Sequence, residues 1–245
     1  MKVFKFGGAS VKDAAGVKNL SSIVHQQHGQ LIVVVSAMGK TTNLLETLCN
    51  AYFHQDPEAT AVMKELKDFH LNIVTSLFPL NAPVYKHLEE LFINLENILA
   101  SESSLCYDYE YDRIICFGEL ISTTIISDYM EMEGIENQFI DIRKFLKTDQ
   151  NYRNANIDLE LSEQLCKEAF DFNTSSTFVT QGFIAGTRTN QTTTLGREGS
   201  DYTAALLANL LNAENVTIWK DVPGVMNADP KEYEKAQVIS RMSYK

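Results

Sequence analysis

Short apolar runs bounded by glycine and polar residues recur along the chain, and each predicts a buried β-strand. The clearest runs cover residues 3–6 and 31–35, and others cover 139–142, 177–180 and 216–219. Between the first two runs, apolar residues recur at helical spacing. A strand, a helix and a second strand in this order imply that the two strands pair in parallel.

Residues 40–117 contain no glycine, and their apolar positions predict several successive amphipathic helices separated by three prolines. No flexible linker flanks this segment, so we expect a helical insertion between sheet elements rather than a separate domain. Within it, Tyr107, Tyr109 and Tyr111 alternate as residues of a strand would, or they mark a loop, and we expect them to serve packing.

The alternation of strands and helices predicts a three-layer α/β/α sandwich with a mostly parallel central sheet. Three more helices are predicted, over residues 120–129, 159–169 and 204–211. Gly7 and Gly8 follow the first strand, and residues 36–39 follow the second. Ligands of open parallel sheets bind at the carboxyl ends of the strands, so we expect both turns to face one crevice.

The amino-acid composition of the chain limits the kinds of molecule that it can bind. With 245 residues, 44% of them apolar, the chain can bury the core of one α/β domain. A formal net charge of -11 argues against nucleic-acid binding, which needs clustered Lys and Arg. The four cysteines show neither CxxC nor framework spacing, no signal peptide follows Met1, and no apolar run could span a bilayer. We expect a cytoplasmic protein without a membrane or nucleic-acid partner.

Two loops have the residues of an anion site. Lys5 interrupts an apolar strand just before Gly7 and Gly8, and a buried lysine is costly unless it is paired; the alternative is an edge strand with Lys5 in solvent. Glycine turns let backbone amides approach a phosphate, and Ser10 adds a hydroxyl. The chain has neither a P-loop nor a dinucleotide-binding fingerprint.

The second loop, TTTLGREGSD over residues 192–201, leads directly into a helix. Free amides and the positive dipole end favour an anion at such a junction. Arg197 has no local partner except Glu198, and its guanidinium suits a substrate carboxylate. Asp201 and Ser200 could each serve simply as a helix cap.

Several other polar residues admit both a functional and a structural interpretation. Glu119, which begins a helix, is either an exposed first-turn acid or an acceptor for a substrate ammonium. Asp221 follows a strand and either faces the crevice or forms the turn before a Pro-Gly pair. His25 and His28 share a helical face, but no further ligand-type residue lies near them, so we expect no metal site there.

Taken together, these segments resemble the catalytic domain of the aspartate kinases, within the amino-acid kinase family. The matching segments, in chain order, are KFGGAS, IVVVSAMGKTTNLL, FGELIST, FIDIRKFLKTD, TQGFIAGT, TTTLGREGSDYTAALLANLLNA and WKDVPGVMNADPK. They run nearly from end to end of the chain, and the ordered set is very specific. The resemblance implies the amino-acid kinase fold, ATP with Mg²⁺, L-aspartate as substrate, and a homodimer.

The resemblance also implies roles for individual residues. Lys5 would neutralise the transferring phosphoryl group, and Asp201 would organise the active centre around it. The residues implied to hold aspartate are Ser36, Thr42, Glu119, Arg197 and Ser200. Those implied to lie against ATP are Lys5, Gly7, Gly8, Ser10, Lys220, Asp221, Met226 and Lys231. The product would be 4-phospho-L-aspartate, in the first step of lysine, threonine and methionine biosynthesis.

The chain departs from the family pattern at five positions. Ala9 replaces a usual threonine, and Glu198 replaces a common glycine beside the anion site. Lys220, Met226 and Lys231 replace a frequent threonine, tyrosine and arginine, which affects nucleotide contacts more than the chemistry.

The last residues resemble the approach to a further helix of these kinases. We therefore expect residues 1–245 to be a catalytic domain truncated at its carboxyl end, with the regulatory domains absent. Two alternatives stay open. One is an amino-acid kinase for another carboxylate, and the other is a catalytically silent fragment that binds a ligand or a subunit.

Overall fold

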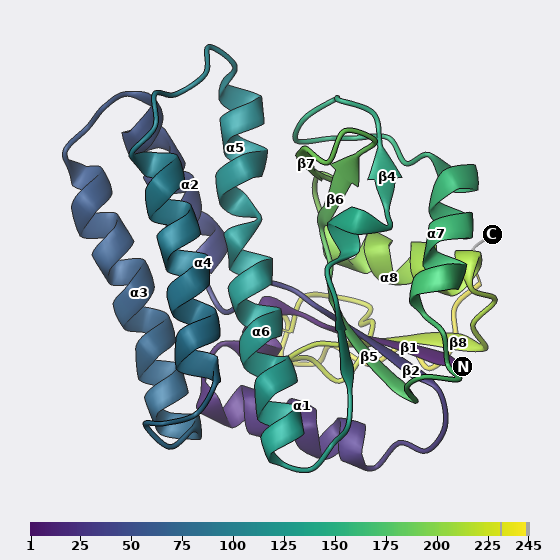
Figure 1. Ribbon diagram of the computed structural model, residues 1–245. Helices are drawn as coiled ribbons and strands as arrows, with labels where there is room; N and C mark the ends of the chain where they lie inside the picture. Colours follow the sequence, from purple (N-terminus) through teal and green to yellow (C-terminus); the bar gives the residue numbers. More distant parts are fainter. Residues whose placement is uncertain (231, 244–245) are drawn as a thin grey trace.

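The computed structural model describes residues 1–230 and 232–243 and places a parallel sheet between layers of helices (Figure 1). The five strands lie in the order β3-β5-β2-β1-β8, and all neighbours pair in parallel. Their bounds are β1 Lys2–Phe6, β2 Leu31–Val35, β3 Gln138–Ile140, β5 Thr177–Gln181 and β8 Asn215–Trp219. The predicted sandwich with a parallel central sheet is confirmed.

Helices cover both faces of this sheet. Helix α8 (Gly199–Leu210) packs against β1, β2 and β8, and α7 (Leu159–Ala169) packs against α8. Helix α6 (Phe117–Met132) packs against β2, β3 and β5, with α1 (Ala14–His25) beside it. Because side chains alternate along a strand, Val3 and Lys5 face α8, whereas Phe4 and Phe6 face the opposite layer.

The glycine-free segment forms a block of helices at one side of the sheet (Figure 1). Its members are α2 Thr41–Phe53, α3 Glu58–Leu77, α4 Val84–Leu99 and α5 Tyr107–Ile115. The three alternating tyrosines belong to α5, so the strand or loop interpretation of that segment is wrong. Only Cys116 separates α5 from α6, and its helical dihedral angles leave the two helices nearly continuous.

A small second sheet, which the sequence did not predict, lies above the central sheet in the view of Figure 1. It contains β4 (Lys147–Thr148), β6 (Ile184–Thr187) and β7 (Thr192–Thr194), with β6 antiparallel to β7. Two 3-10 helices, η1 (Gly8–Val11) and η2 (Ile142–Lys144), complete the elements.

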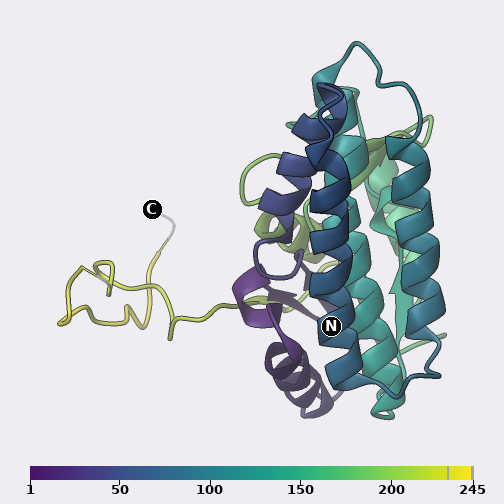
Figure 2. The same cartoon turned by 90° about the vertical axis from the view of Figure 1, so that its left-hand side faces the viewer.

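β1 is the fourth strand of five and pairs on both sides, so the edge-strand alternative for Lys5 is wrong. Lys5 is only 6% exposed. The chain beyond β8 leaves the body of the molecule and is largely exposed (Figure 2). None of the helices within the described residues combines the length and apolar character needed to cross a bilayer.

Candidate active site

A cavity of about 490 Å³ opens at the carboxyl ends of the strands, where residues from both ends of the chain meet. We call it the central cavity. It is lined by Lys5, Ser36, Thr42, Tyr111, Glu119, Arg153, Phe183, Thr194, Gly196, Arg197, Glu198, Gly199, Ser200, Asp201 and Lys220. Parallel strands bring these segments together because their carboxyl ends share one edge of the sheet.

Two turns can meet at this edge because Gly8 has no side chain. A Cβ at Gly8 would lie 2.6 Å from the carbonyl oxygen of Ala37, well inside contact distance. The amide of Gly39 also donates to the carbonyl of Gly8, at 3.0 Å. The predicted juxtaposition of the first two strand-ending turns is therefore present.

The floor of the central cavity holds one carboxylate between two lysines. Asp201 Oδ1 lies 2.5 Å from Lys5 Nζ, and Asp201 Oδ2 lies 3.2 Å from Lys220 Nζ. Burial alone would raise the pKa of Asp201, but the hydrogen bonds and charges of the two lysines outweigh it and lower the pKa. Asp201 is therefore ionised at neutral pH, and the group carries a net positive charge suited to an anion.

Glu119 supplies an unsatisfied acceptor. It is 3% exposed and belongs to the first turn of α6, where the helix dipole favours an acid. Its Oε1 accepts the amide of Ala37 at 3.1 Å, whereas Oε2 is buried without a hydrogen-bond partner. Burial raises the pKa of Glu119 to about 8, against the opposing effects of the Ala37 amide and Lys5. A buried polar atom without a partner, in a residue that lines a cavity, is suited to a hydrogen bond from a ligand.

The close approach of α6 to the β2–α2 turn depends on Gly118. A Cβ at this position would lie 2.9 Å from the Cβ of Ala37. With glycine there, Glu119 reaches the Ala37 amide, which explains the FGE sequence at the start of the helix.

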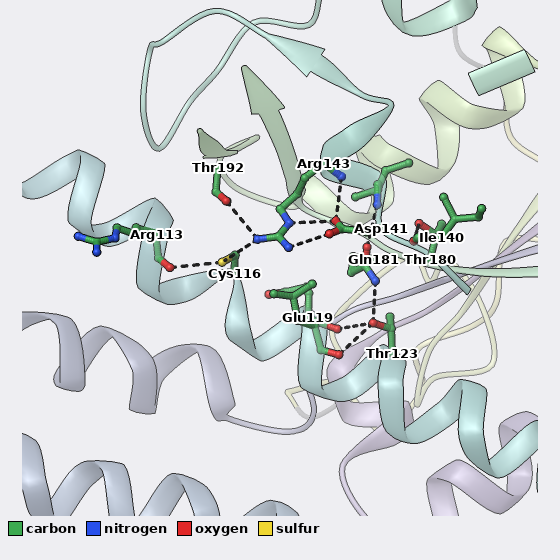
Figure 3. Close-up of polar contacts among 12 residues, drawn as sticks. Arg113, Cys116, Glu119, Thr123, Ile140, Asp141, Arg143, Thr180, Gln181 and Thr192 are labelled. Atoms are coloured by element: carbon green, nitrogen blue, oxygen red, sulfur yellow. Dashed lines mark hydrogen bonds and ion pairs between the residues drawn. The ribbon is translucent and has the colours of Figure 1, made fainter. Parts of the chain in front are cut away.

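Behind Glu119, a chain of polar contacts fixes the first turns of α6 (Figure 3). The Thr123 hydroxyl donates to the Glu119 carbonyl at 2.7 Å and accepts from Gln181 Nε2 at 2.9 Å. Gln181 Oε1 in turn accepts the Ile142 amide at 2.9 Å. These contacts connect α6 to the end of β5 and to η2.

Arg143 connects the two walls of the site (Figure 3). Its guanidinium holds Asp141 through two contacts, of 2.9 and 2.7 Å. The same group donates to the Thr192 hydroxyl at 3.2 Å and to the Cys116 sulfur at 3.8 Å. Thr192 begins β7, which leads into the loop that carries Arg197, and Cys116 precedes α6, which carries Glu119. Arg143 therefore holds these two segments in a fixed position relative to each other.

The side chains of Arg197 and Glu198, in that loop, are exposed. Within the described residues, neither side chain makes an ion pair or hydrogen bond, and both line the central cavity. Glu198 precedes α8 with φ of +57°, a left-handed conformation that glycine adopts without cost. The conformation supplies a physical reason why glycine suits this position.

Strained backbone is concentrated around the cavity. Of six non-glycine residues with positive φ in the described part of the chain, Arg153, Phe183 and Glu198 line the central cavity. Such conformations cost of order 1 kcal/mol each and persist where the surroundings hold them. Their clustering is typical of a functional site.

Asp112 connects α5 to two other segments that line the central cavity. It is fully buried in α5, and its carboxylate accepts the Thr194 hydroxyl at 2.7 Å and the amides of Thr194 and Arg153 at 2.9 Å. Burial raises the pKa of Asp112 to about 6, although these hydrogen bonds oppose the shift. Three segments of the cavity wall therefore meet at one carboxylate.

The profile of the amino acid kinase family matches residues 1–245. The chain belongs to this family. Lysine-sensitive aspartokinase 3 of Escherichia coli is 32% identical over 244 residues, which cover 99% of this chain and 54% of that protein. Aspartokinase of Chlamydia pneumoniae is 31% identical over 242 residues, covering 99% of this chain and 52% of its own.

A solved structure gives the same relationship. The crystal structure of E. coli aspartokinase III in complex with aspartate and ADP matches with a TM-score of 0.89 and 31% identity, over 98% of this chain and 53% of that chain. This amino acid kinase chain thus spans about half the length of the relatives it matches.

The structure brings together eight residues that the sequence analysis selected. They are Lys5, Ser36, Thr42, Glu119, Arg197, Ser200, Asp201 and Lys220, all lining the central cavity of this amino acid kinase. The exposed first-turn interpretation of Glu119 is wrong, because its side chain is buried.

The other predicted nucleotide contacts lie beside or beyond the cavity lining. Gly7 lies beside Lys5 Nζ, and the Gly7 amide and the Ser10 hydroxyl both donate to the carbonyl of Trp219, at 3.3 Å. Asp221 and Met226 belong to the segment that leaves the body after β8 (Figure 2). Lys231 lies outside the described residues.

Three residues of the central cavity, Tyr111, Arg153 and Phe183, lie outside the two predicted anion-site loops and were not among the candidates. Phe183 falls within a segment that carried the family resemblance, so the sequence offered a signal for it. The other lining residues, Thr194, Gly196, Glu198 and Gly199, belong to the second predicted loop. Tyr111 was assigned to packing because its helix was not recognised. For Arg153 the sequence offers no signal, since its place depends on the fold of an irregular loop.

Proposed function

We propose that this chain is the catalytic domain of an aspartate kinase, transferring the γ-phosphoryl group of ATP to the β-carboxylate of L-aspartate. The observation that carries the proposal is the buried, unpartnered Oε2 of Glu119 in a cavity that also contains Arg197 and the Lys5–Asp201 pair. An acidic amino acid has the complementary charges: an ammonium, and two carboxylates.

The geometry supports a division of labour within the central cavity. Glu119 accepts the substrate ammonium, and Arg197 pairs with a carboxylate through its guanidinium fork. Ser36, Thr42 and Ser200 also line the central cavity and offer hydroxyl groups to the substrate. The family relatives named above, one of them solved with aspartate and ADP, favour aspartate over other acids.

The chemistry requires positioning more than acid–base catalysis. A carboxylate is an adequate nucleophile without a general base, so the protein has to align it with the phosphorus atom and stabilise charge on the phosphoryl oxygens. Lys5 is buried, paired and fixed on an inner strand, which are the properties of a preorganised cation. Asp201 holds Lys5 and Lys220 in place beside the transferred group.

The central cavity does not form a cage for a resident metal ion. Within the described residues no cluster of three or more His, Cys, Asp or Glu could hold one, and the Asp201 carboxylate is already paired with Lys5 and Lys220. Mg²⁺ would therefore arrive with ATP, coordinated mainly by phosphate and water oxygens. Lys220, Gly7, Gly8, Ser10, Asp221, Met226 and Lys231 remain the proposed nucleotide residues.

The proposal extends to the context of the domain. We assign residues 1–245 to a cytoplasmic kinase domain with a helical insertion at about 40–117, acting in the biosynthesis of lysine, threonine and methionine. The homodimer implied by the resemblance belongs to the same proposal.

A hydroxamate assay tests the activity. Purified protein is incubated with ATP, Mg²⁺, hydroxylamine and single amino acids, because hydroxylamine traps acyl phosphates as coloured hydroxamates. We expect hydroxamate with L-aspartate and none with L-glutamate. Product with another acid instead would reassign the substrate, and no product with any acid would leave a ligand-binding role.

A further inference from the structure

The central cavity contains a second guanidinium besides that of Arg197. Arg153 lines it from the loop between β4 and α7, and its side chain is 47% exposed. No segment that carried the family resemblance includes this residue. A second arginine in a cavity that already contains two lysines is unexpected for packing alone, because like charges repel.

Arg153 is held in place by contacts at both ends of the residue. Its backbone has φ of +65°, and its amide donates to the buried Asp112 carboxylate at 2.9 Å. Its guanidinium lies 4.3 Å from the ring centre of Tyr111, whose hydroxyl donates to Glu46 at 2.7 Å. Stacking on a fixed ring preorganises the guanidinium without using its N–H groups, which point outward from the ring edge-on and can bind an anion.

One competitor for this guanidinium is present. Asp108, in the first turn of α5, accepts from Arg153 Nη1 at 3.2 Å. Both side chains are about half exposed, and ion pairs of this kind contribute little. Asp108 can therefore be replaced by a bound carboxylate at small cost.

We propose that Arg153 is a specificity-determining residue that binds, together with Arg197, the non-reacting α-carboxylate of the amino-acid substrate. This inference rests on the proposed function. The reacting carboxylate has to reach the phosphoryl group near Lys5, and two guanidinium contacts would weaken it as a nucleophile. The α-carboxylate is already charged in both ground and transition states, so arginine contacts to it improve binding uniformly.

The test uses variants whose effects differ in sign. Arg153→Gly removes the guanidinium while accepting the left-handed backbone, and Arg153→Lys keeps a charge without the planar fork. Asp108→Asn removes the competitor. Arg188→Ala is the matched control, because Arg188 is also an exposed arginine paired with an aspartate, Asp158 at the start of α7, but does not line the central cavity.

Steady-state hydroxamate kinetics give the first result. We expect Arg153→Gly to raise the KM for aspartate about tenfold with kcat nearly unchanged, as for the loss of a charged hydrogen bond in a uniform binding contact. Arg153→Lys should recover part of the loss, and Asp108→Asn should lower KM about twofold. The control should match the original protein.

A substrate analogue shows which carboxylate is bound. L-Aspartate 1-amide keeps the reacting carboxylate but has a neutral amide in place of the other. If Arg153 binds the α-carboxylate, Arg153→Gly should change the KM for this amide less than twofold. An equal loss with aspartate and with the amide, or a fall in kcat at unchanged KM, would overturn the inference.

Calorimetric titration of aspartate separates this inference from the proposed function. If the protein binds aspartate but forms no hydroxamate, the kinase proposal fails while the tenfold change in Kd for Arg153→Gly still supports the role of Arg153. If aspartate binds equally well to both proteins, or does not bind at all, the role of Arg153 is wrong.

Discussion

Lys5 Nζ and Asp201 Oδ1 lie 2.5 Å apart, which joins the first strand of the chain to its last long helix. A lysine in the middle of an apolar strand is unfavourable by itself. Its buried position becomes understandable once α8 delivers a carboxylate from the other end of the sequence. The pair lines the central cavity, where the two predicted anion-site loops meet.

Replacing Lys5 tests this arrangement. Lys5→Met keeps most of the side-chain volume but removes the charge that we assign to the phosphoryl group. We expect kcat to fall at least about 100-fold, the usual loss when a preorganised electrostatic contact is removed. Hydroxamate rates at saturating ATP and aspartate measure it. Lys18→Ala, on the exposed face of α1, is the control, and a Lys5 variant with full activity would refute the mechanism.

Glu119 should impose a pH dependence on substrate binding. Its pKa is raised to about 8, and the ionised form attracts the substrate ammonium. The kcat/KM for aspartate should therefore rise between about pH 7 and pH 9, with an apparent pKa near 8 in the free enzyme. Glu119→Gln should abolish this rise and weaken aspartate binding about 10- to 100-fold. A flat profile in the unmodified protein would contradict the assignment.

The same residue should limit stability at alkaline pH. The folded-state pKa of Glu119 lies above the value of about 4.3 expected for an unfolded chain. Its stabilising contribution is therefore fully present below the unfolded pKa and lost as pH rises through the folded pKa of about 8. Between pH 6 and pH 9, the Tm of the Glu119→Gln variant should therefore fall by less than the Tm of the original protein falls, as measured by thermal unfolding.

Substitutions of Glu198 separate the effect of its left-handed backbone on stability from the effect of its negative charge on ATP binding. Glu198→Gly relieves the left-handed backbone, offset in part by the greater freedom of glycine in the unfolded chain, so we expect stabilisation of about 0.5 kcal/mol. Glu198→Ala removes the same charge without relieving the backbone and should not be stabilised. Urea unfolding separates the two variants. If the charge impedes ATP binding, both should lower the KM for ATP equally.

The Asp141–Arg143 pair should act on both stability and geometry. Arg143→Met leaves the largely buried Asp141 carboxylate without its guanidinium partner, and we expect the free energy of unfolding to fall by about 2 kcal/mol. The double variant Asp141→Asn/Arg143→Met should be less destabilised than the single one. Burial raises the pKa of Asp141, but Arg143 outweighs it and lowers the pKa. The pair's contribution to the free energy of unfolding is therefore present above the pKa that Asp141 has in the unfolded chain, and it is lost as pH falls through the pKa of Asp141 in the folded protein.

The centre of the sheet could be predicted because β2 is a short, continuous apolar run and β1 differs from one only by its lysines, as expected for parallel strands buried on both faces. The second sheet could not, because β4 has two residues and β7 is a run of threonines. The tyrosines of α5 were misleading, since spacing of two is a strand pattern. In the structure, Tyr107 and Tyr111 lie one helical turn apart, while Tyr109 contacts Tyr152.

The candidate site was predictable where chemistry and position coincide. Lys5 lies near the carboxyl end of a strand, Glu119 and Asp201 lie in the first turns of helices, and such positions converge at one sheet edge. Burial is a different property. Nothing in the sequence distinguishes the fully buried Asp112 from the half-exposed Asp108 in the same helix, because the difference arises from long-range packing against β7 and the loop of Arg153.

Helices α5 and α6 form one column interrupted only at Cys116 (Figure 1). Tyr111 and Glu119 therefore belong to a single rod, separated by about 12 Å at the rise of an α-helix. A small slide or tilt of this rod would move the aromatic support of Arg153 and the ammonium acceptor together. Lys5, anchored on an inner strand, would stay in place. The column thus gives Tyr111 and Glu119 one common support, separate from the strand that holds Lys5.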